Sequence, residues 1–423
     1  MMSDHTAEAR AHFLSEKKIV VAGAGIAGLA FVIALRKLWP PSVKPPVVVV
    51  YDRDAKETSI GRQGYSLSLH GTDRESGLFT LKQLGLLDDI INFAVFPVQA
   101  QAQGTGHFTM WTHELKPMLS VRPKAAPGLP TAGIRIARKN LRRVLVEAAS
   151  ASATICWGTA CKSVRQLDDG RLQIQLASDR STELDECDIL VAADGASSQI
   201  RGCLRPDDNL QFAGSVQIVG TAQFESEIPS PLGTSFGTVL TGTGVNCFFS
   251  PVDEHTLVWG LSVLERTPRE KHDSSNPQHA QELLMQAREL GKAIKEPFQT
   301  VINATDPSSA LVLNAMDKPP FAHDDKTGPV IFIGDANHAV SPFAGNGANL
   351  ALTDGWDLAE QLCQSVSLDA AIRAYDKRSV PRATTTLNRS HWHIQVGHAT
   401  GWTYWMYRAF FTVVGAIVKV ASR

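Results

Sequence analysis

Three glycines near the start of the chain have a spacing that suits the binding of a phosphate group. Gly23, Gly25 and Gly28 form the pattern GxGxxG. The first glycine permits a tight turn, the second lets the backbone approach a pyrophosphate, and the third lets a helix pack closely on a strand. Ile26 and Ala27 would begin that helix, whose first N–H groups point toward an anion. We therefore expect these five residues to bind a dinucleotide.

The sequence around the glycines predicts the elements that such a site requires. The pattern alone is weak evidence, because any glycine-rich turn can match it by chance. Here an apolar run, Ile19 to Ala22, precedes it, and apolar residues recur at helical spacing from Ile26 to Trp39. A second run, Val47 to Tyr51, leads to Asp52 and then Arg53. The Asp52 carboxylate can accept a hydrogen bond from a ribose hydroxyl. This order predicts a βαβ unit with parallel, buried strands.

Two later strands also end on acidic residues. The β-branched run from 188 to 193 is followed by Asp194, and the run from 330 to 333 is followed by Gly334 and Asp335. Ligands of parallel sheets bind beyond the carboxyl ends of the strands. We therefore expect Asp194 and Asp335 to lie at the same edge as the glycine turn.

Several segments resemble one enzyme family. The segment GDANHAVSPFAGNGANLALTDGWDLAEQL, residues 334–362, closely resembles the second flavin motif of the FAD-dependent aromatic hydroxylases, single-component flavoprotein monooxygenases that include para-hydroxybenzoate hydroxylase. VAADGASSQIR, with Asp194 and Arg201, resembles the middle motif of that family, and Arg138 begins a segment with its RxxLxxxL pattern. The segment PFAGNGAN is also similar to the corresponding segment of tetracycline-inactivating monooxygenases and of fungal enzymes of secondary metabolism.

The downstream motif has residues suited to a flavin ring. Asp335 can accept a hydrogen bond from a ribityl hydroxyl, while Gly345 and Gly347, after Pro342, let the backbone run flat against a ring edge. A helix then begins, so the first N–H groups at Gly347, Ala348 and Asn349 can point at the N1 and C2 carbonyl edge. The bland alternative is a capped core helix after a glycine-rich turn. We expect these residues of the motif to bind FAD: Asp335, Pro342, Gly345, Gly347, Ala348 and Asn349.

The resemblance assigns roles to further charged residues. It implies that Arg138 lies near the flavin or its phosphates, although an exposed helical arginine is the alternative. Arg62 resembles the residue that clasps the flavin when the ring swings outward. Asp194 and Arg201 would help to form the cofactor groove. The alternative for Asp194 is a purely structural role as a helix-capping residue.

The implied activity is FAD-dependent monooxygenation. The FAD would be tightly bound, NADPH or NADH would bind transiently, and O2 would react through a flavin C4a-hydroperoxide to hydroxylate or epoxidise an aromatic or polycyclic molecule. A halogenase or alkene reductase on the same scaffold, or a non-catalytic flavin-binding redox module, remains open as an alternative. We name no catalytic residue; His107, His113, Asp253 and His255 are guesses, and none of the five tyrosines lies in the expected substrate layer.

Composition sets further limits on the 423 residues. The 41 Lys and Arg and 42 Asp and Glu give a net charge of −1, so nucleic acid is not an expected partner. Six scattered cysteines suggest reduced thiols and no metal site, and the polar N-terminus suggests the cytoplasm. The chain would act as a monomer or homodimer.

The expected fold is α/β: a Rossmann-like FAD domain with a mostly parallel sheet, an antiparallel β substrate layer covered by helices, and a C-terminal helix. Between about 205 and 308, alternating segments broken by Gly, Ser and Pro predict the antiparallel layer. We assign residues 1–95, 130–204 and 309–375 to the FAD domain, 96–129 and 205–308 to the substrate domain, and 376–423 to a helical segment.

The C-terminal segment is unusually aromatic. Residues 391–423 hold seven of the 30 aromatic residues, and only ten uncharged residues separate Arg408 from Lys419. That run is shorter than the roughly 20 residues that cross a bilayer. We expect this segment to dock against the two domains, with membrane association and self-association as less favoured alternatives.

Overall fold

The apolar run before the first glycines forms the central strand of a parallel sheet. In the computed structural model, which describes residues 12–56, 65–101, 105–121, 123–179, 181–270 and 277–421, this strand has parallel neighbours on both sides. The order β17-β11-β1-β2-β7 confirms the predicted parallel sheet. The five strands are β1 (Lys18–Ala22), β2 (Val47–Asp52), β7 (Thr154–Trp157), β11 (Ile189–Ala192) and β17 (Val330–Phe332).

The two faces of this sheet are covered differently. Ile19 and Val21 join a core that includes the helices, whereas Val20 and Ala22 face a three-stranded antiparallel sheet. The alternation of one buried strand between two cores explains why its sequence is apolar throughout. The covering elements are α1 (Ile26–Leu38), α6 (Arg138–Ser150), α11 (Gly347–Gln364), β8 (Thr159–Gln166), β9 (Leu172–Ser178) and β10 (Thr182–Cys187).

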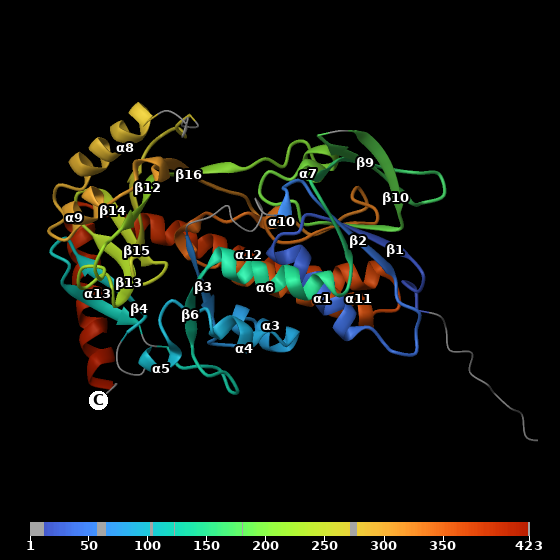
Figure 1. Ribbon diagram of the computed structural model, residues 1–423, viewed down its shortest axis with the longest axis horizontal. Coiled ribbons are helices and arrows are strands. Elements are labelled where there is room, and N and C mark those ends of the chain that lie inside the picture. The colour runs from blue at the N-terminus through green and yellow to red at the C-terminus, as the bar shows by residue number, and fades with distance from the viewer. Residues whose placement is uncertain are drawn as a thin grey trace, which may run out of the picture.

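A seven-stranded sheet forms the other half of the molecule (Figure 1). Its strands come from both expected segments, and β16 extends it beyond the expected boundary at residue 308. The sheet is antiparallel except where β13 pairs in parallel with β4, because these strands come from separate chain segments and no hairpin joins them. In spatial order the strands are β16 (Leu311–Asp317), β12 (Gln211–Gln223), β15 (Thr256–Leu264), β14 (Val245–Pro251), β13 (Ser235–Leu240), β4 (His107–Thr112) and β5 (Pro117–Val121).

Short elements connect the halves and complete their cores. The pair β3–β6 lies between the two larger sheets, and α8 and α9 supply residues to the core of the seven-stranded sheet. The remaining elements are β3 (Ser66–His70), β6 (Gly133–Ala137), α3 (Gly77–Leu84), α4 (Leu87–Ile91), α5 (Val98–Gln101), α7 (Gln199–Leu204), α8 (Pro277–Leu290), α9 (Phe298–Asn303), η1 (Pro307–Ser309), α10 (Asp335–His338) and η2 (Pro342–Ala344).

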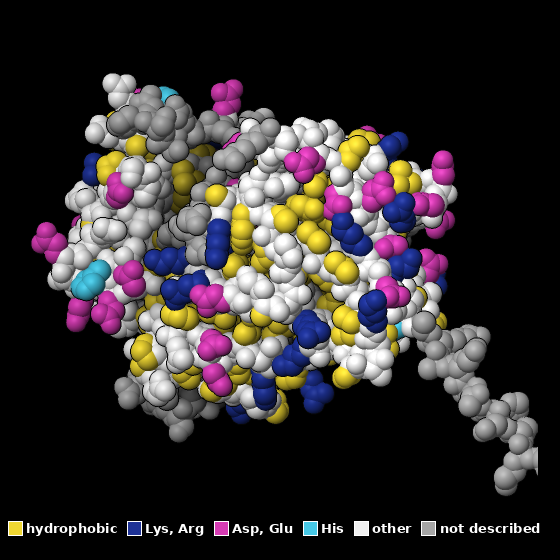
Figure 2. All heavy atoms as spheres, turned by 45° about the vertical axis from the view of Figure 1, so that its right-hand side comes forward, with side chains coloured by type: hydrophobic (Ala, Val, Ile, Leu, Met, Phe, Trp, Pro, Cys, Tyr) yellow, Lys and Arg dark blue, Asp and Glu magenta, His cyan; other side chains and the backbone are white. Residues whose placement is uncertain are grey.

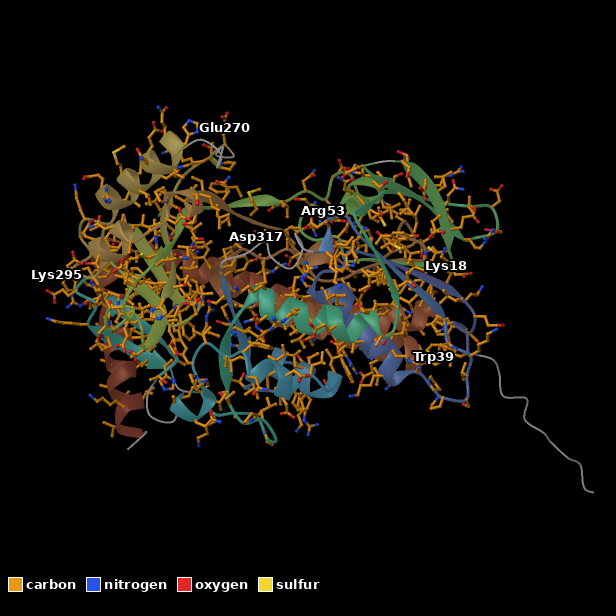
Figure 3. All side chains as sticks on the ribbon, viewed as in Figure 1. Lys18, Trp39, Arg53, Glu270, Lys295 and Asp317 are labelled. Carbon is orange, nitrogen blue, oxygen red and sulfur yellow. The ribbon has the colours of Figure 1, made fainter. Side chains whose placement is uncertain are left out.

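Two helices end the described chain. α12 (Leu368–Gly397) runs from the parallel-sheet half to the seven-stranded sheet, and α13 (Gly401–Ala421) lies on the outer side of that sheet (Figure 1). Asp317 lies between the halves, whereas Lys18 and Lys295 mark their far ends (Figure 3). Within the described residues, no helix is long and apolar enough to cross a membrane. Basic and acidic side chains are interspersed on the face drawn in Figure 2.

Candidate active site

The first glycine turn has the geometry that each of its glycines requires. Gly23 has φ +108°, and a Cβ there would lie 2.4 Å from the Ala193 oxygen. A Cβ on Gly28 would lie 2.2 Å from the Gly23 oxygen, so this glycine permits the helix to pack on the turn. Among the described residues, a Cβ on Gly25 would have one neighbour within 4 Å, the Ala193 oxygen at 3.7 Å. The turn therefore leaves open space at Gly25, where a pyrophosphate can approach.

Asp52 holds this turn in place. Its Oδ2 accepts a hydrogen bond from the Ala24 N–H at 2.8 Å, and its Oδ1 accepts one from the Asp54 N–H at 2.9 Å. A carboxylate has about four lone-pair sites, so capacity remains for a ribose hydroxyl. Arg142 holds the opposite side of the turn, because its guanidinium donates to the Ala24 oxygen at 2.6 Å. The sequence interpretation missed Arg142, although it lies one helical turn after Arg138 on α6.

The second glycine turn also faces open space. After η2, Gly345 adopts φ +61°, and Gly347 begins α11. Among the described residues, a Cβ on Gly345 would meet nothing within 4 Å, and one on Gly347 would meet only Val340, at 3.9 Å. A flat ring could therefore lie against this backbone, with the first N–H groups of α11 at its edge.

A close helix crossing brings the two glycine turns together. A Cβ on Gly355 of α11 would lie 2.6 Å from the Phe31 nitrogen and 2.7 Å from the Ala27 oxygen of α1. Gly334 is also next to α1, since its Cβ would lie 3.0 Å from that of Ala27. These small residues let α1 and α11, whose first residues are 321 positions apart in the sequence, pack closely enough to serve one ligand.

Asp335 presents an accessible carboxylate between buried neighbours. Its side chain is exposed although Gly334 and Ala336 are buried, as expected for a residue that lines an open groove. The surrounding protein raises the pKa of Asp335 by desolvation, while His338 and Arg138 oppose that rise. The site therefore has a hydrogen-bonding carboxyl at the end of the strand β17, near the glycine turns.

The middle motif supports the element that carries Asp335. Asp194 accepts hydrogen bonds from the N–H groups of Gln199 and Ile200, so it caps α7, while its Oδ1 is buried without a partner among the described residues. Arg201 donates to the Ala336 oxygen at 2.8 Å. Buried Lys318 donates to the next carbonyl, that of Asn337, at 2.5 Å. Two cations thus fix the end of α10.

A buried ionic network lies behind the same motif. Asp354 of α11 accepts from the Gly334 N–H at 2.9 Å, contacts His338 Nε2 at 2.5 Å and pairs with Arg382 at 3.0 Å. Burial raises the pKa of Asp354, but His338 and Arg382 outweigh it, so the net shift is downward. Burial lowers the pKa of His338, but Asp354 outweighs it and the net shift is upward. The network ties α10, α11 and α12 together.

The other expected cofactor residues occupy different surroundings. The guanidinium of Arg138 lies 5.9 Å from the centre of the Tyr65 ring, and it opposes the upward pKa shift of Asp335. The exposed Arg53 side chain lies 3.9 Å from Asp54. In Figure 3 Arg53 lies near the middle of the molecule. Arg62 lies outside the described residues.

Asn349 uses its side chain to anchor α11. Its Oδ1 accepts from the N–H groups of His70 at 2.8 Å and Gly77 at 3.1 Å, and its Nδ2 donates to the Ser68 oxygen at 2.9 Å. Both lone pairs of Oδ1 and one N–H of Nδ2 are thus used inside the protein. Pro342 begins η2, directly before the glycine turn.

Arg135 is a buried cation that the sequence interpretation missed. Its guanidinium donates to Ser66 and Ser68 of β3 and to Ser250 of β14, each at 2.6 Å to a hydroxyl oxygen. It also lies 4.9 Å from the centre of the Phe236 ring. No described carboxylate pairs with it, and burial lowers its pKa to about 9. The signal in the sequence is a lone arginine within the apolar strand GIRIA.

The guessed catalytic side chains do not form a constellation. Asp253 Oδ1 accepts from the N–H groups of His255 and Thr256, so this pair stabilises a surface turn. The C-terminal segment folds back and places Tyr404 of α13 against Gly242 beside β13. His398 comes from the same segment and contacts Ser262 of β15 at 2.9 Å.

Two surface hollows lie beside these elements. One is lined by Phe79, Trp356 and Arg378 and contains none of the expected cofactor residues, and we assign no role to it. The other is lined in part by Ser198 and Arg201 of the middle motif.

Comparisons with known proteins identify the family and agree with the fold. Residues 16–390 match the family model described as FAD binding domain. A relative named monooxygenase cfoF, from Aspergillus candidus, is 45% identical over 396 residues, which cover 92% of this chain and 94% of that one. The structure of Klebsiella pneumoniae HpxO with FAD and uric acid aligns with a TM-score of 0.73 at 20% identity, covering 95% of this chain and 94% of HpxO. Tetracycline destructase Tet(51) aligns with a TM-score of 0.63 at 16% identity, covering 95% and 97%.

Proposed function

Since the chain belongs to the FAD binding domain family and is an FAD-dependent monooxygenase, we propose that it uses NAD(P)H and O2 to hydroxylate or epoxidise an aromatic or polycyclic small molecule. The observation that carries this proposal is that two open glycine turns lead into α1 and α11, which pack closely against each other. FAD bound there would accept a hydride from NAD(P)H and activate O2 for transfer of one oxygen atom.

The residues of the first turn would hold the dinucleotide portion. Gly25 and the N-terminus of α1 would contact the pyrophosphate, and Asp52 would accept a hydrogen bond from a hydroxyl of the adenosine ribose. In this proposal Arg53 and Arg138 would approach the phosphates. In this proposal Asp335 accepts a hydrogen bond from the ribityl chain.

The second turn would hold the ring. Gly345 and Gly347 leave space for a flat group, and the N-terminus of α11 would stabilise negative charge on the reduced ring. The protein's own part is to position the ring and to keep water away from it.

The substrate would lie between this turn and the seven-stranded sheet. Phe236 and Phe248 of that sheet lie 4.9 and 5.9 Å from Arg135, so aromatic surface and a buried cation occur together there. This combination suits an aromatic substrate that is acidic, such as a phenol, because Arg135 would stabilise its anion.

The proposal can be tested on purified protein with its native flavin. We expect NADPH or NADH to bleach the flavin absorbance under anaerobic conditions, and a true substrate to increase the rate of NAD(P)H oxidation in air. Phenolic and polycyclic aromatic compounds are the first candidates to screen. Failure of both nicotinamides to reduce the flavin, with or without these compounds, would contradict the proposal.

A further inference from the structure

The helix α13 has two apolar faces, of which only one is buried. Tyr404 and Phe411 are 5% and 4% exposed and pack with Met110, Met118 and Leu240 of the seven-stranded sheet. The contact is close, because a Cβ on Gly415 would lie 2.1 Å from the Met118 oxygen. This side of α13 is therefore docked as a part of the fold.

The opposite side of α13 is apolar and exposed. Its side chains are between 56% and 74% exposed and recur every three to five residues, as one face of a helix requires. A contiguous exposed surface of this kind marks an interaction site. We call it the tail face: Trp402, Trp405, Phe410, Val413, Ile417 and Val420.

The charge of this region favours an anionic surface as the partner. The helix α13 carries two basic residues, Arg408 and Lys419, and no Asp or Glu. Arg408 and Lys419 are 11 residues apart, about three turns of 3.6 residues, so they share one edge of the tail face. The Arg408 guanidinium also lies 4.9 Å from the centre of the Trp405 ring. The acidic residue Glu114 lies in the turn before β5, the strand on which α13 packs. Its negative charge is balanced there by ion pairs with Lys116 and Lys295.

Together these features match a helix that lies in a membrane interface. Such helices bury Trp, Phe and aliphatic side chains at the boundary between headgroups and acyl chains and carry basic residues at the polar edge. We propose that the tail face binds the surface of a membrane that contains anionic lipids, with α13 parallel to it. In Figure 1 α13 runs along the outer edge of the seven-stranded sheet, where a flat surface could reach it.

The proposal is tested by flotation of the flavin-loaded protein with vesicles. We expect binding to equimolar phosphatidylcholine and phosphatidylserine to exceed binding to phosphatidylcholine alone by at least about tenfold at low salt. The combined variant Trp405→Ser, Phe410→Ser and Ile417→Ser should lower binding at least about tenfold and keep the thermal stability and flavin content. The variant Arg408→Gln with Lys419→Gln should reduce the preference for anionic vesicles.

A matched control removes exposed apolar side chains elsewhere. Leu184 and Val366 are 64% and 90% exposed, and Leu184→Ser with Val366→Ser should leave vesicle binding unchanged. Equal binding by the parent chain and the triple tail variant would overturn the proposal, as would absence of binding to both vesicles. A homodimer that fails to bind vesicles, and that the triple variant dissociates in light scattering, would assign the tail face to a second copy instead. None of these outcomes depends on monooxygenase activity.

Discussion

At the scale of single residues, the glycines of the first turn differ in the space that surrounds each one. Gly28 is required by packing, because a Cβ there collides with the Gly23 oxygen, whereas in the described part of the chain a Cβ on Gly25 would meet only the Ala193 oxygen, at 3.7 Å. In the proposal, what requires Gly25 is the approach of the pyrophosphate. The spacing GxGxxG predicted both positions. The two requirements differ in their experimental consequences.

Gly25→Val tests the role of the open space. Gly25 has ordinary extended backbone angles, so we expect the variant to fold with an unchanged melting temperature of the flavin-free protein. The added methyl groups would occupy the phosphate position, and the affinity for FAD should fall at least about tenfold, a loss of about 1.4 kcal/mol. FAD titration by fluorescence measures the effect.

Two variants serve as comparisons for Gly25→Val. Gly25→Ala should have a smaller effect on FAD affinity, and Gly28→Val should reduce stability itself. Normal FAD affinity in Gly25→Val would place the pyrophosphate elsewhere.

Residues outside known spacings were the ones that the sequence did not reveal. Arg142 binds the first glycine turn, and Arg135 binds β3 and β14. Only the folded chain brings these groups together, because the partners are more than 60 residues away in the sequence. Asn349 lies in the expected motif, but its side chain binds β3 and α3, which periodicity cannot show.

At the scale of elements, the buried network of Asp354 connects three helices near the candidate ring site. Removal of one member of a buried ionic network leaves the other charges unpaired. We expect Asp354→Asn to destabilise the protein by about 3 kcal/mol, which chemical denaturation would measure. Arg373→Ala is the matched control, because the Arg373–Asp369 pair on α12 is exposed and should contribute less than about 1 kcal/mol. Similar effects of the two variants would contradict the assigned role of the network.

The same network predicts a pH dependence. The pKa of Asp354 is lowered, so its contribution is present above its ordinary pKa of 3.8 and is lost as pH falls through the lowered value. The pKa of His338 is raised, so its contribution is present below its ordinary 6.5 and is lost as pH rises through the raised value. The stability difference between the parent chain and His338→Gln should therefore be largest between pH 3.8 and 6.5. Denaturant titrations across pH would detect it, and a difference that grows toward alkaline pH would contradict the pairing.

The docked face of α13 gives a further test at this scale. Phe411 is 4% exposed and Phe410 is 56% exposed on the same helix. We expect Phe411→Ala to lower the free energy of unfolding by about 3 kcal/mol. Phe410→Ala should change it by less than about 0.5 kcal/mol. If both variants kept the parent stability, the docking of α13 on the seven-stranded sheet would be wrong.

Helices and strands with a clear periodicity of apolar residues were predictable, whereas the strands and helices that they pack against were less so. The runs that form β1, β2, β11 and β17 predicted a parallel sheet, because continuous apolar strands between helices have few other solutions. The parallel pairing of β4 with β13 and the addition of β16 to the same sheet were not visible, since pairing between distant segments leaves no local pattern. The apolar character on both sides of α13 was visible, but which side is docked was not.

At the scale of the whole molecule, the arrangement accounts for a neutral protein that binds a charged cofactor. With 41 cations and 42 anions, the chain has no basic surface excess, and glycine backbones with two helix N-termini would hold the phosphates and the reduced ring locally. In the proposal above, the seven-stranded sheet would supply the side on which a substrate approaches. The central claim of the account is that FAD held at these turns would supply one oxygen atom from O2 to a substrate bound beside it.

Oxygen incorporation tests this claim most directly. The purified flavin-loaded protein is given NAD(P)H, a compound that stimulates its oxidation, and isotopically labelled O2, and the product is analysed by mass spectrometry. The account predicts a product that carries one labelled oxygen atom, formed in proportion to the NAD(P)H consumed. A product that takes its oxygen from water, or label that appears only in hydrogen peroxide with every stimulating compound, would contradict it.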